Sequence, residues 1–230
     1  MRIFRGMLVL LAAAMAAPAG ADEAWRVDKD QDGIQVSTRA VEGWSMREIR
    51  GGMHADARLS SLVAVIVDVR VAHDLSDVVA EQRVLQRDND TRYSLYSAMK
   101  LPWPVSNRDI VNQREIAQDP VSLAVTITDL AVANAPPQDG YVRMTRSRQK
   151  WTLTPAAGGG VQVEMRALSD PNGPIPAFIV NAMAVDGPFK TLSKLRALAQ
   201  SPAYAAAVLP FIREPASSSN ANPSTEQGGS

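Results

Sequence analysis

The feature that most constrains the fold is an apolar run near the C-terminal end, preceded by a dense group of turn residues. The turn residues are Ser169–Pro176, where Asp-Pro and Asn-Gly-Pro steps favour turns because proline fixes φ and glycine accepts unusual backbone angles. Gly187-Pro188 is expected to kink the following helix or to divide it in two. The helix itself is predicted because apolar residues recur at spacings of three and four: Phe178, Ile179, Ala182, Met183, Val185, Phe189, Leu192, Leu195 and Leu198.

Almost everything before this helix has the pattern of β-strands. Asp32-Gly33 between two alternating segments predicts a hairpin. Further strands are predicted over residues 45–51, 82–86, 91–99, 108–117, 121–129, 141–153 and 161–168. The resulting prediction is an α+β fold, in which a curved antiparallel sheet wraps around one long C-terminal helix.

One earlier segment, residues 56–68, is predicted to be a helix despite its β-branched residues. Leu59, Leu62 and Ile66 keep helical spacing, and Asp56 is a candidate N-cap.

Charge and cysteine content exclude several classes of function. The formal net charge is zero, so nothing suggests nucleic acid as a partner. The chain has no cysteine, which excludes a zinc–thiolate site, a thiol nucleophile and a disulfide framework. No phosphate-binding glycine loop or dinucleotide fingerprint is present, and no cofactor is expected.

Residues 1–21 have the pattern of a cleavable signal peptide. Arg2 and Arg5 precede an apolar, alanine-rich run over residues 7–17, and Ala19-Gly20-Ala21 supplies a small-residue cleavage pattern. The run is shorter than the roughly 20 residues that span a bilayer. We therefore expect export to the periplasm, with an uncleaved interfacial anchor as the alternative. Removal of the segment would leave 22 basic and 24 acidic residues.

The mature chain is expected to form one domain over residues 22–213. Residues 214–230 are rich in Ser, Asn, Pro and Gly and contain no large apolar residue. Such a segment buries too little surface to offset its ordering entropy, so a disordered tail is predicted.

Two multi-residue motifs carry a family resemblance. Leu101-Pro102-Trp103-Pro104-Val105-Ser106-Asn107-Arg108-Asp109 resembles the Pro-Trp-Pro-x-Ser-x-Arg-Asp signature of bacterial START (steroidogenic-acute-regulatory-related lipid transfer) domains. Ser169–Pro176, with Asn181, is similar to the motif that opens the last helix of those domains. The resemblance covers roughly residues 24–200. It implies a helix-grip fold with a ligand tunnel between the sheet and the C-terminal helix, and non-catalytic binding or transfer of a lipid or sterol-like apolar molecule, with transient membrane contact.

The resemblance also implies a buried arginine that meets the polar group of a ligand, paired with an acid on the preceding strand. Arg114 matches that arginine, but residues 91–99 contain no acid. Either the ligand is anionic, or another acid supplies the charge, or Arg114 faces solvent. The candidate ligand-binding residues are Tyr93, Leu95, Asn112, Arg114, Phe178 and Met183.

Other noticeable residues have plainer interpretations. Trp103 is either a membrane-touching residue at the tunnel mouth or, as we expect, packed against the sheet. Arg108 and Asp109 are expected to form a local structural ion pair. His54 and His73 are too far apart in sequence to suggest a metal site, and surface positions are expected for both. No metal site and no catalytic residue is predicted.

Two other functions stay open. The first is an enzyme of the helix-grip superfamily, of the cyclase or dehydratase type, which would need tunnel residues able to move protons. The second is an interaction domain whose tunnel is filled by large side chains.

Overall fold

The computed structural model describes residues 23–133, 135–176, 179–180 and 182–216. The predicted signal peptide, Phe178, Asn181 and residues 217–230 of the predicted tail lie outside the described residues. The strands are β1 (Arg26–Gln31), β2 (Ile34–Arg39), β3 (Glu48–Ala55), β4 (Val79–Asn89), β5 (Arg92–Met99), β6 (Arg108–Gln118), β7 (Val125–Ala131), β8 (Val142–Met144), β9 (Arg146–Pro155) and β10 (Val161–Asp170). The helices are α1 (Leu59–Val67), the 3₁₀ turn η1 (Val69–Val71), α2 (Ala72–Leu75), the π-helical turn η2 (Ala182–Asp186) and α4 (Gly187–Gln200).

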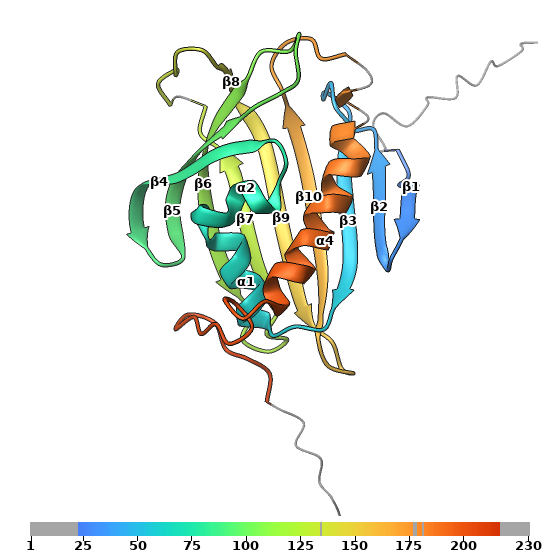
Figure 1. The fold of residues 1–230 in the computed structure, drawn as a ribbon, viewed down its shortest axis with the longest axis vertical. Helices are drawn as coiled ribbons and strands as arrows, with labels where there is room; N and C mark the ends of the chain where they lie inside the picture. Colours follow the sequence, from blue (N-terminus) through green and yellow to red (C-terminus); the bar gives the residue numbers. More distant parts are fainter. Residues whose placement is uncertain (1–22, 134, 177–178, 181, 217–230) are drawn as a thin grey trace, which may run out of the picture.

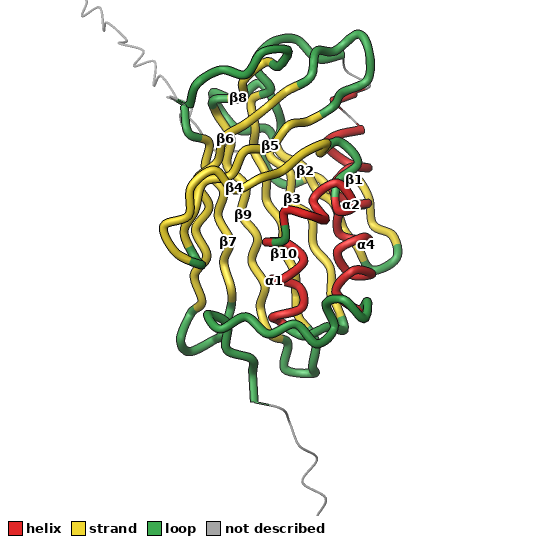
Figure 2. Tube along the Cα trace, turned by 60° about the vertical axis from the view of Figure 1, so that its left-hand side comes forward, coloured by secondary structure: helices red, strands yellow, loops and turns green. Residues whose placement is uncertain are grey.

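The described strands form one open sheet in the order β1-β2-β3-β10-β9-β7-β6-β5-β4. Neighbours along this order are antiparallel, and the short β8 pairs with β6 in the parallel sense. The sheet is curved, and the helices lie against its inner side (Figures 1 and 2). The predicted α+β helix-grip fold is therefore confirmed.

Several strands show how local sequence sets the topology. The predicted hairpin is present: Asp32 (φ 54°) and Gly33 (φ 70°) both have positive φ, as a type I′ turn between β1 and β2 requires. The long strand predicted over residues 141–153 is instead divided into β8 and β9. The strand predicted from residue 121 begins only at Val125, because the Asp119 side chain accepts hydrogen bonds from the backbone of Val121 and Ser122 and holds that segment in a turn.

Helix α1 packs its apolar face against the sheet, as its spacing predicts. The cap differs from the prediction: the helix begins at Leu59, and Asp56 does not cap it. The carboxylate of Glu214 accepts hydrogen bonds from the backbone N–H groups of Leu59 (3.2 Å) and Ser60 (2.7 Å) instead. A carboxylate at a helix N-terminus satisfies donors that have no partner within the helix. The chain just before residue 217 therefore returns to the domain.

The C-terminal helix divides at the predicted place. The π-helical turn η2 ends at Asp186, and α4 begins with Gly187-Pro188. Proline is tolerated in the first turn of a helix because the N–H that it lacks would have no partner within that helix. Its buried residues include Leu192, Leu195 and Ala199. A Cβ added to Gly51 of β3 would lie 2.7 Å from Cδ1 of Leu192, so glycine there permits the close approach of helix and strand.

The main core lies between the sheet and the helices α1 and α4. It is built from Leu, Ile, Val and Met side chains together with Tyr93 and Trp151. Among the described helices, none combines the length and apolar character that crossing a membrane requires.

Candidate functional site

Two adjoining cavities lie between the sheet and the beginning of the C-terminal helix. The larger, of about 280 Å³, is lined by side chains that include Val65, Leu75, Trp151, Met165 and Pro188. The smaller, of about 200 Å³, is lined by Met46, Leu101, Met144, Val180 and Val185, among others. Four residues line both cavities: Ile49, Met99, Ala167 and Met183. Together they follow the line of the helix and form one candidate site, which we call the cargo site.

Methionine is concentrated in the walls of the cargo site. Of the six methionines among the described residues, all but Met53 line one or both cavities. Methionine is unbranched and rotates about three bonds, so it fills irregular space and adapts to different contacts. The walls are therefore apolar and adjustable.

A buried ion pair lies at one side of the larger cavity. Arg114 donates to both carboxylate oxygens of Asp129, with Nε–Oδ1 and Nη2–Oδ2 distances of 2.7 and 2.6 Å, and also to the carbonyl oxygen of Ile66. Both side chains are almost wholly buried. Burial acts to lower the pKa of Arg114, but the charge and hydrogen bonds of Asp129 outweigh it and raise that pKa. Of the three alternatives considered for Arg114, the structure shows the one in which another acid, Asp129, supplies the partner charge. The alternative in which Arg114 faces solvent is excluded.

The predicted site residues do not all reach the cargo site. Arg114 lines the larger cavity, and Met183 lies in the wall that both cavities share. Tyr93 and Leu95 are part of the packed core, and neither they nor Asn112 line either cavity. The Oδ1 atom of Asn112 is buried without a hydrogen-bond partner among the described residues. The predicted contact of Phe178 lies outside the described residues.

The sequence analysis missed two acidic groups at the edge of the larger cavity. Asp68 accepts hydrogen bonds from Arg70 and from the Tyr204 hydroxyl (2.8 Å), and the hydrogen bond from Arg70 lowers the pKa of Asp68 to about 2. Asp77 forms ion pairs with Lys190 (3.1 Å) and Lys194 of α4, which lower its pKa, the Lys194 hydrogen bond most. Both carboxylates are therefore ionised at neutral pH. Apart from Arg70, the partners of Asp68 and Asp77 are distant in sequence. No local motif therefore indicated either carboxylate.

Two expectations about the first motif are wrong. Arg108 and Asp109 do not pair with each other: both carboxylate oxygens of Asp109 accept from Arg143 of β8, at 2.8 and 2.7 Å. Successive strand residues point to opposite faces, which separates the two side chains. Trp103 does not pack against the sheet either, since it is 91% exposed.

The two histidines behave as the sequence suggests. His54 and His73 are both partly exposed, and each lies beside a neighbouring aspartate. Within the part of the chain that the structure describes, no group of three or more His, Cys, Asp or Glu side chains is arranged to hold a metal ion.

Known proteins resemble this chain in sequence and in structure. An uncharacterized protein of Pseudomonas aeruginosa is 28% identical over 200 residues, which cover 85% of this chain and 98% of the relative. The phosphatidylcholine transfer protein of Rattus norvegicus is 24% identical over 173 residues, which cover 73% of this chain and 79% of the relative. A crystal structure of the STAR-related lipid transfer protein of Xanthomonas axonopodis superimposes with a TM-score of 0.69 and 35% identity, covering 77% of this chain and 99% of that one.

The START domain family model matches residues 8–203, which is most of the chain. The matched segment contains the curved sheet, both quoted motifs and the whole of α4. The crystal structure named for lipid transfer shares the fold of this chain. The chain belongs to the START domain family.

Proposed function

We propose that this protein binds a lipid, or another apolar molecule with a small polar group, in the cargo site and carries it without chemical change. The observation that carries the proposal is the pair of adjoining, methionine-rich cavities beneath the C-terminal helix. Ligand sites are commonly concave, mostly apolar and about 300–1,000 Å³ in volume. Each cavity alone is smaller than this range, whereas the two joined into one site would fall within it. The space left by the described residues also argues against an interaction domain with a filled tunnel.

The apolar walls are sufficient to hold such a cargo. Covering roughly 300 Å² of apolar ligand surface at ~25 cal/mol per Å² contributes about 7 kcal/mol before the costs of association. This is enough for capture of a molecule that otherwise partitions into a membrane.

The charged groups beside the cargo site favour binding over catalysis. A general acid or base works best with a pKa near the operating pH. Asp68 has a pKa lowered to about 2, and the lysines of α4 lower that of Asp77. The charge of Arg114 is paired with Asp129, and Arg114 also donates to a backbone carbonyl. We therefore infer that the groups around the cargo site orient a ligand and do not move protons on it.

The first test is extraction of lipid from the purified protein, combined with a variant that fills the site. Ala167 is in the wall shared by the two cavities, and a phenylalanine there would occupy both. We expect Ala167→Phe to weaken binding of a neutral pyrene-labelled alkyl probe about ten- to hundredfold, since overpacking costs about 1–3 kcal/mol. The measurement is a fluorescence titration.

The matched control is Ala117→Phe on the exposed face of β6, which should leave probe affinity unchanged. Equal affinity in Ala167→Phe and the wild type would place the probe elsewhere. Absence of both co-purifying lipid and probe binding in the wild type would refute the proposed function itself.

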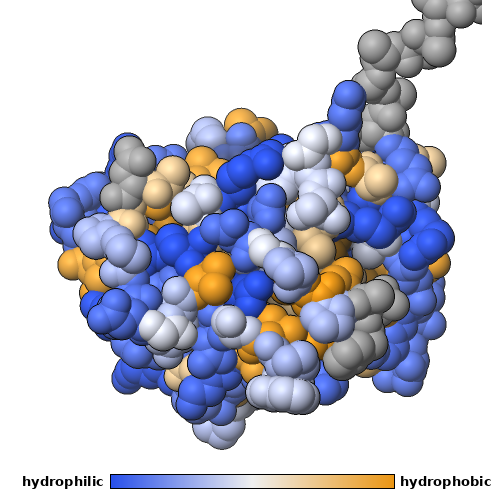
Figure 3. Space-filling view, turned by 90° about the horizontal axis from the view of Figure 1, so that it is seen from above, coloured by the Kyte–Doolittle hydropathy of each residue, from blue (hydrophilic) through white to orange (hydrophobic). Residues whose placement is uncertain are grey.

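We further propose that the loop over residues 100–107 contacts the membrane during transfer. Trp103 is almost fully exposed, while Leu101 and Arg108, on either side of it, line the smaller cavity. Figure 3 views the end of the molecule that is uppermost in Figure 1, where apolar surface is interspersed with hydrophilic surface. Tryptophan suits the interface between headgroups and acyl chains because its ring is apolar and its N–H is polar.

Replacing Trp103 with alanine is expected to reduce binding to neutral phosphatidylcholine vesicles about tenfold. Burial of roughly 60 Å² of the ring at ~25 cal/mol per Å² corresponds to about 1.5 kcal/mol. Vesicle sedimentation measures the effect. Val121 is 90% exposed and follows the other end of β6, so Val121→Ala is the control and should bind like the wild type. Equal losses in both variants would contradict a specific role for this loop.

The periplasmic location expected from residues 1–21 is likewise a proposal. Cell fractionation, with the N-terminus determined on the exported protein, tests it. Cleavage after Ala21 would leave Asp22 at the N-terminus, whereas an uncleaved anchor would keep the protein with the membrane fraction.

A further inference from the structure

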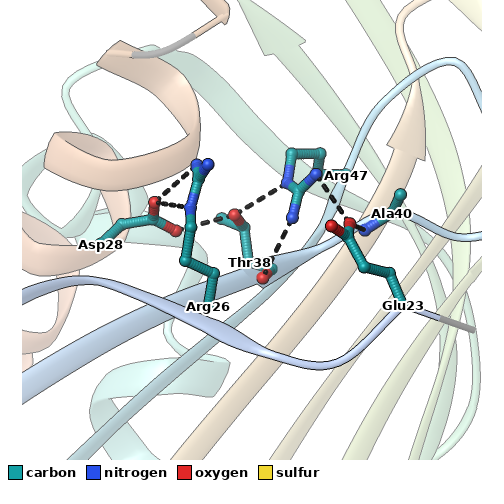
Figure 4. Close-up of polar contacts among 6 residues, drawn as sticks. All are labelled: Glu23, Arg26, Asp28, Thr38, Ala40 and Arg47. Carbon is teal, nitrogen blue, oxygen red and sulfur yellow. Dashed lines mark hydrogen bonds and ion pairs between the residues drawn. The ribbon is translucent and has the colours of Figure 1, made fainter.

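The smaller cavity has an unusual charge environment. Arg26, Arg47 and Arg108 all line it, and none of its lining residues is acidic. Two of these arginines already have carboxylate partners outside the cavity wall. Arg26 forms an ion pair with Asp28 at 2.7 Å, and Arg47 forms one with Glu23 at 3.0 Å (Figure 4). Their positive charges are therefore locally compensated.

Arg108 differs from the other two because it has no acidic partner among the described residues. It is only 4% exposed. Its Nε donates to the carbonyl oxygen of Pro171 at 3.1 Å, and its Nη1 donates to the carbonyl oxygen of Ser106. The adjacent Asp109 is fully occupied by Arg143. Burial without a compensating carboxylate lowers the pKa of Arg108.

The geometry leaves Arg108 able to donate hydrogen bonds to a further partner. A guanidinium has five N–H donors, and two carbonyl oxygens engage only two of them. A buried positive charge without a counter-charge is unfavourable, so an anion beside it would be strongly stabilised. Thr38 and Ser169 also line the smaller cavity, but the Thr38 hydroxyl donates to Asp28 (2.7 Å) and the Ser169 hydroxyl is hydrogen-bonded to that of Ser147 (2.6 Å).

Arg108 lies where the cargo site meets the outside. It lines the smaller cavity and also an open recess of about 560 Å³ between the two motif loops, whose walls include Pro104, Ser106 and Gly173. The carboxylates of Asp68 and Asp77 are instead at the larger cavity. The cargo site therefore has one end with an uncompensated positive charge and another with apolar walls and acidic groups.

We propose that Arg108 binds an oxyanion headgroup of the cargo, a carboxylate or a phosphate, at the mouth of the smaller cavity. The apolar chain then extends past Met183 and Ala167 into the larger cavity. This inference rests on the proposed function, and it narrows the cargo to anionic amphiphiles with the headgroup outermost. The two carbonyl contacts of Arg108 also hold the motif loops together, so the experiment must separate that structural role from anion binding.

The experiment compares sixteen-carbon ligands that differ in the headgroup. Hexadecanoate, hexadecyl phosphate and neutral hexadecan-1-ol each displace the neutral pyrene-labelled probe from the full mature chain. Hydrogen bonds to charged groups are typically worth more than neutral ones, and we expect the wild type to bind the better of the two anions at least about tenfold more tightly than the alcohol. The two anionic arms show whether carboxylate or phosphate is preferred.

Variants then assign the preference to Arg108. Arg108→Gln should weaken binding of that anion about ten- to hundredfold and change alcohol binding less than about threefold. The control Arg92→Gln, at an arginine that is 57% exposed and lines neither cavity, should leave both unchanged. Arg108→Lys keeps the charge and should retain part of the preference. Alcohol binding reports whether each variant is still folded.

Three outcomes would overturn the inference, and one of them needs no variant. Equal affinity of the wild type for the anions and the alcohol would refute it directly. Equal loss of anion and alcohol binding in Arg108→Gln would reduce Arg108 to a structural role. Loss of the anion preference in Arg92→Gln would mean that the preference does not arise from the arginine in the cavity wall. If the wild type binds none of the ligands, the proposed function fails before the headgroup is in question.

Discussion

Replacing Arg114 with methionine is expected to lower the free energy of unfolding by about 3–5 kcal/mol, which is the usual cost of breaking a buried ion pair by removing one partner. The reason is Asp129, whose side chain is 4% exposed and which would lose both hydrogen bonds from Arg114. The carbonyl oxygen of Ile66 at the end of α1 would lose its contact as well. Urea unfolding at neutral pH measures the change.

The matched controls separate the buried charge from the loss of an arginine as such. Arg92→Met removes an arginine from the neighbouring strand, where the ion pair with Glu115 has both side chains more than half exposed, and should cost less than about 1 kcal/mol. The double variant Arg114→Met with Asp129→Leu should recover most of the lost stability, because no buried charge remains. A loss in Arg114→Met no larger than that in Arg92→Met would contradict our account of the pair.

Replacing Leu192 with alanine is expected to cost about 2–5 kcal/mol, the usual range for a buried leucine. Leu192 is fully buried on α4 and lies close to Gly51 of β3, at the contact that holds the helix against the sheet. The glycine has no side chain with which to fill the space that the alanine would leave. Thermal and urea unfolding of the purified variant provide the measurement.

Leu130→Ala is the control, since Leu130 is 51% exposed on β7 and its truncation should change stability by no more than about 0.5 kcal/mol. Similar results for the two leucines would mean that α4 is not packed on the sheet as described.

The parts of the fold that depend on local chemistry could be predicted from the sequence. Asp32-Gly33 favours one kind of turn, and Gly187-Pro188 interrupts one helix and starts another, so both features appear where expected. Features that depend on distant segments could not be predicted in this way. The capping of α1 by Glu214 joins residues more than 150 positions apart, and the local candidate Asp56 does not fill that role.

The same distinction applies to the candidate site. Arg114 was identifiable from the motif that precedes its strand, but its partner Asp129 lies on the following strand and is brought opposite by the β6–β7 register. Tyr93 and Leu95 share the inner side of the sheet with Arg114, yet they fill core space away from the cavities. Pattern alone shows which side of a strand faces inward; which inward side chains border empty space depends on where the helices lie.

The methionine-rich walls bear on selectivity. A rigid cavity of branched side chains measures the length of an acyl chain closely, whereas unbranched thioethers rotate to close around shorter chains and withdraw from longer ones. Met99 and Met183 line both cavities, so rotation of their side chains would change how much of the cargo site a given molecule can occupy. We therefore expect affinity to vary only gently with the number of methylene groups, leaving most of the discrimination to the polar end of the molecule.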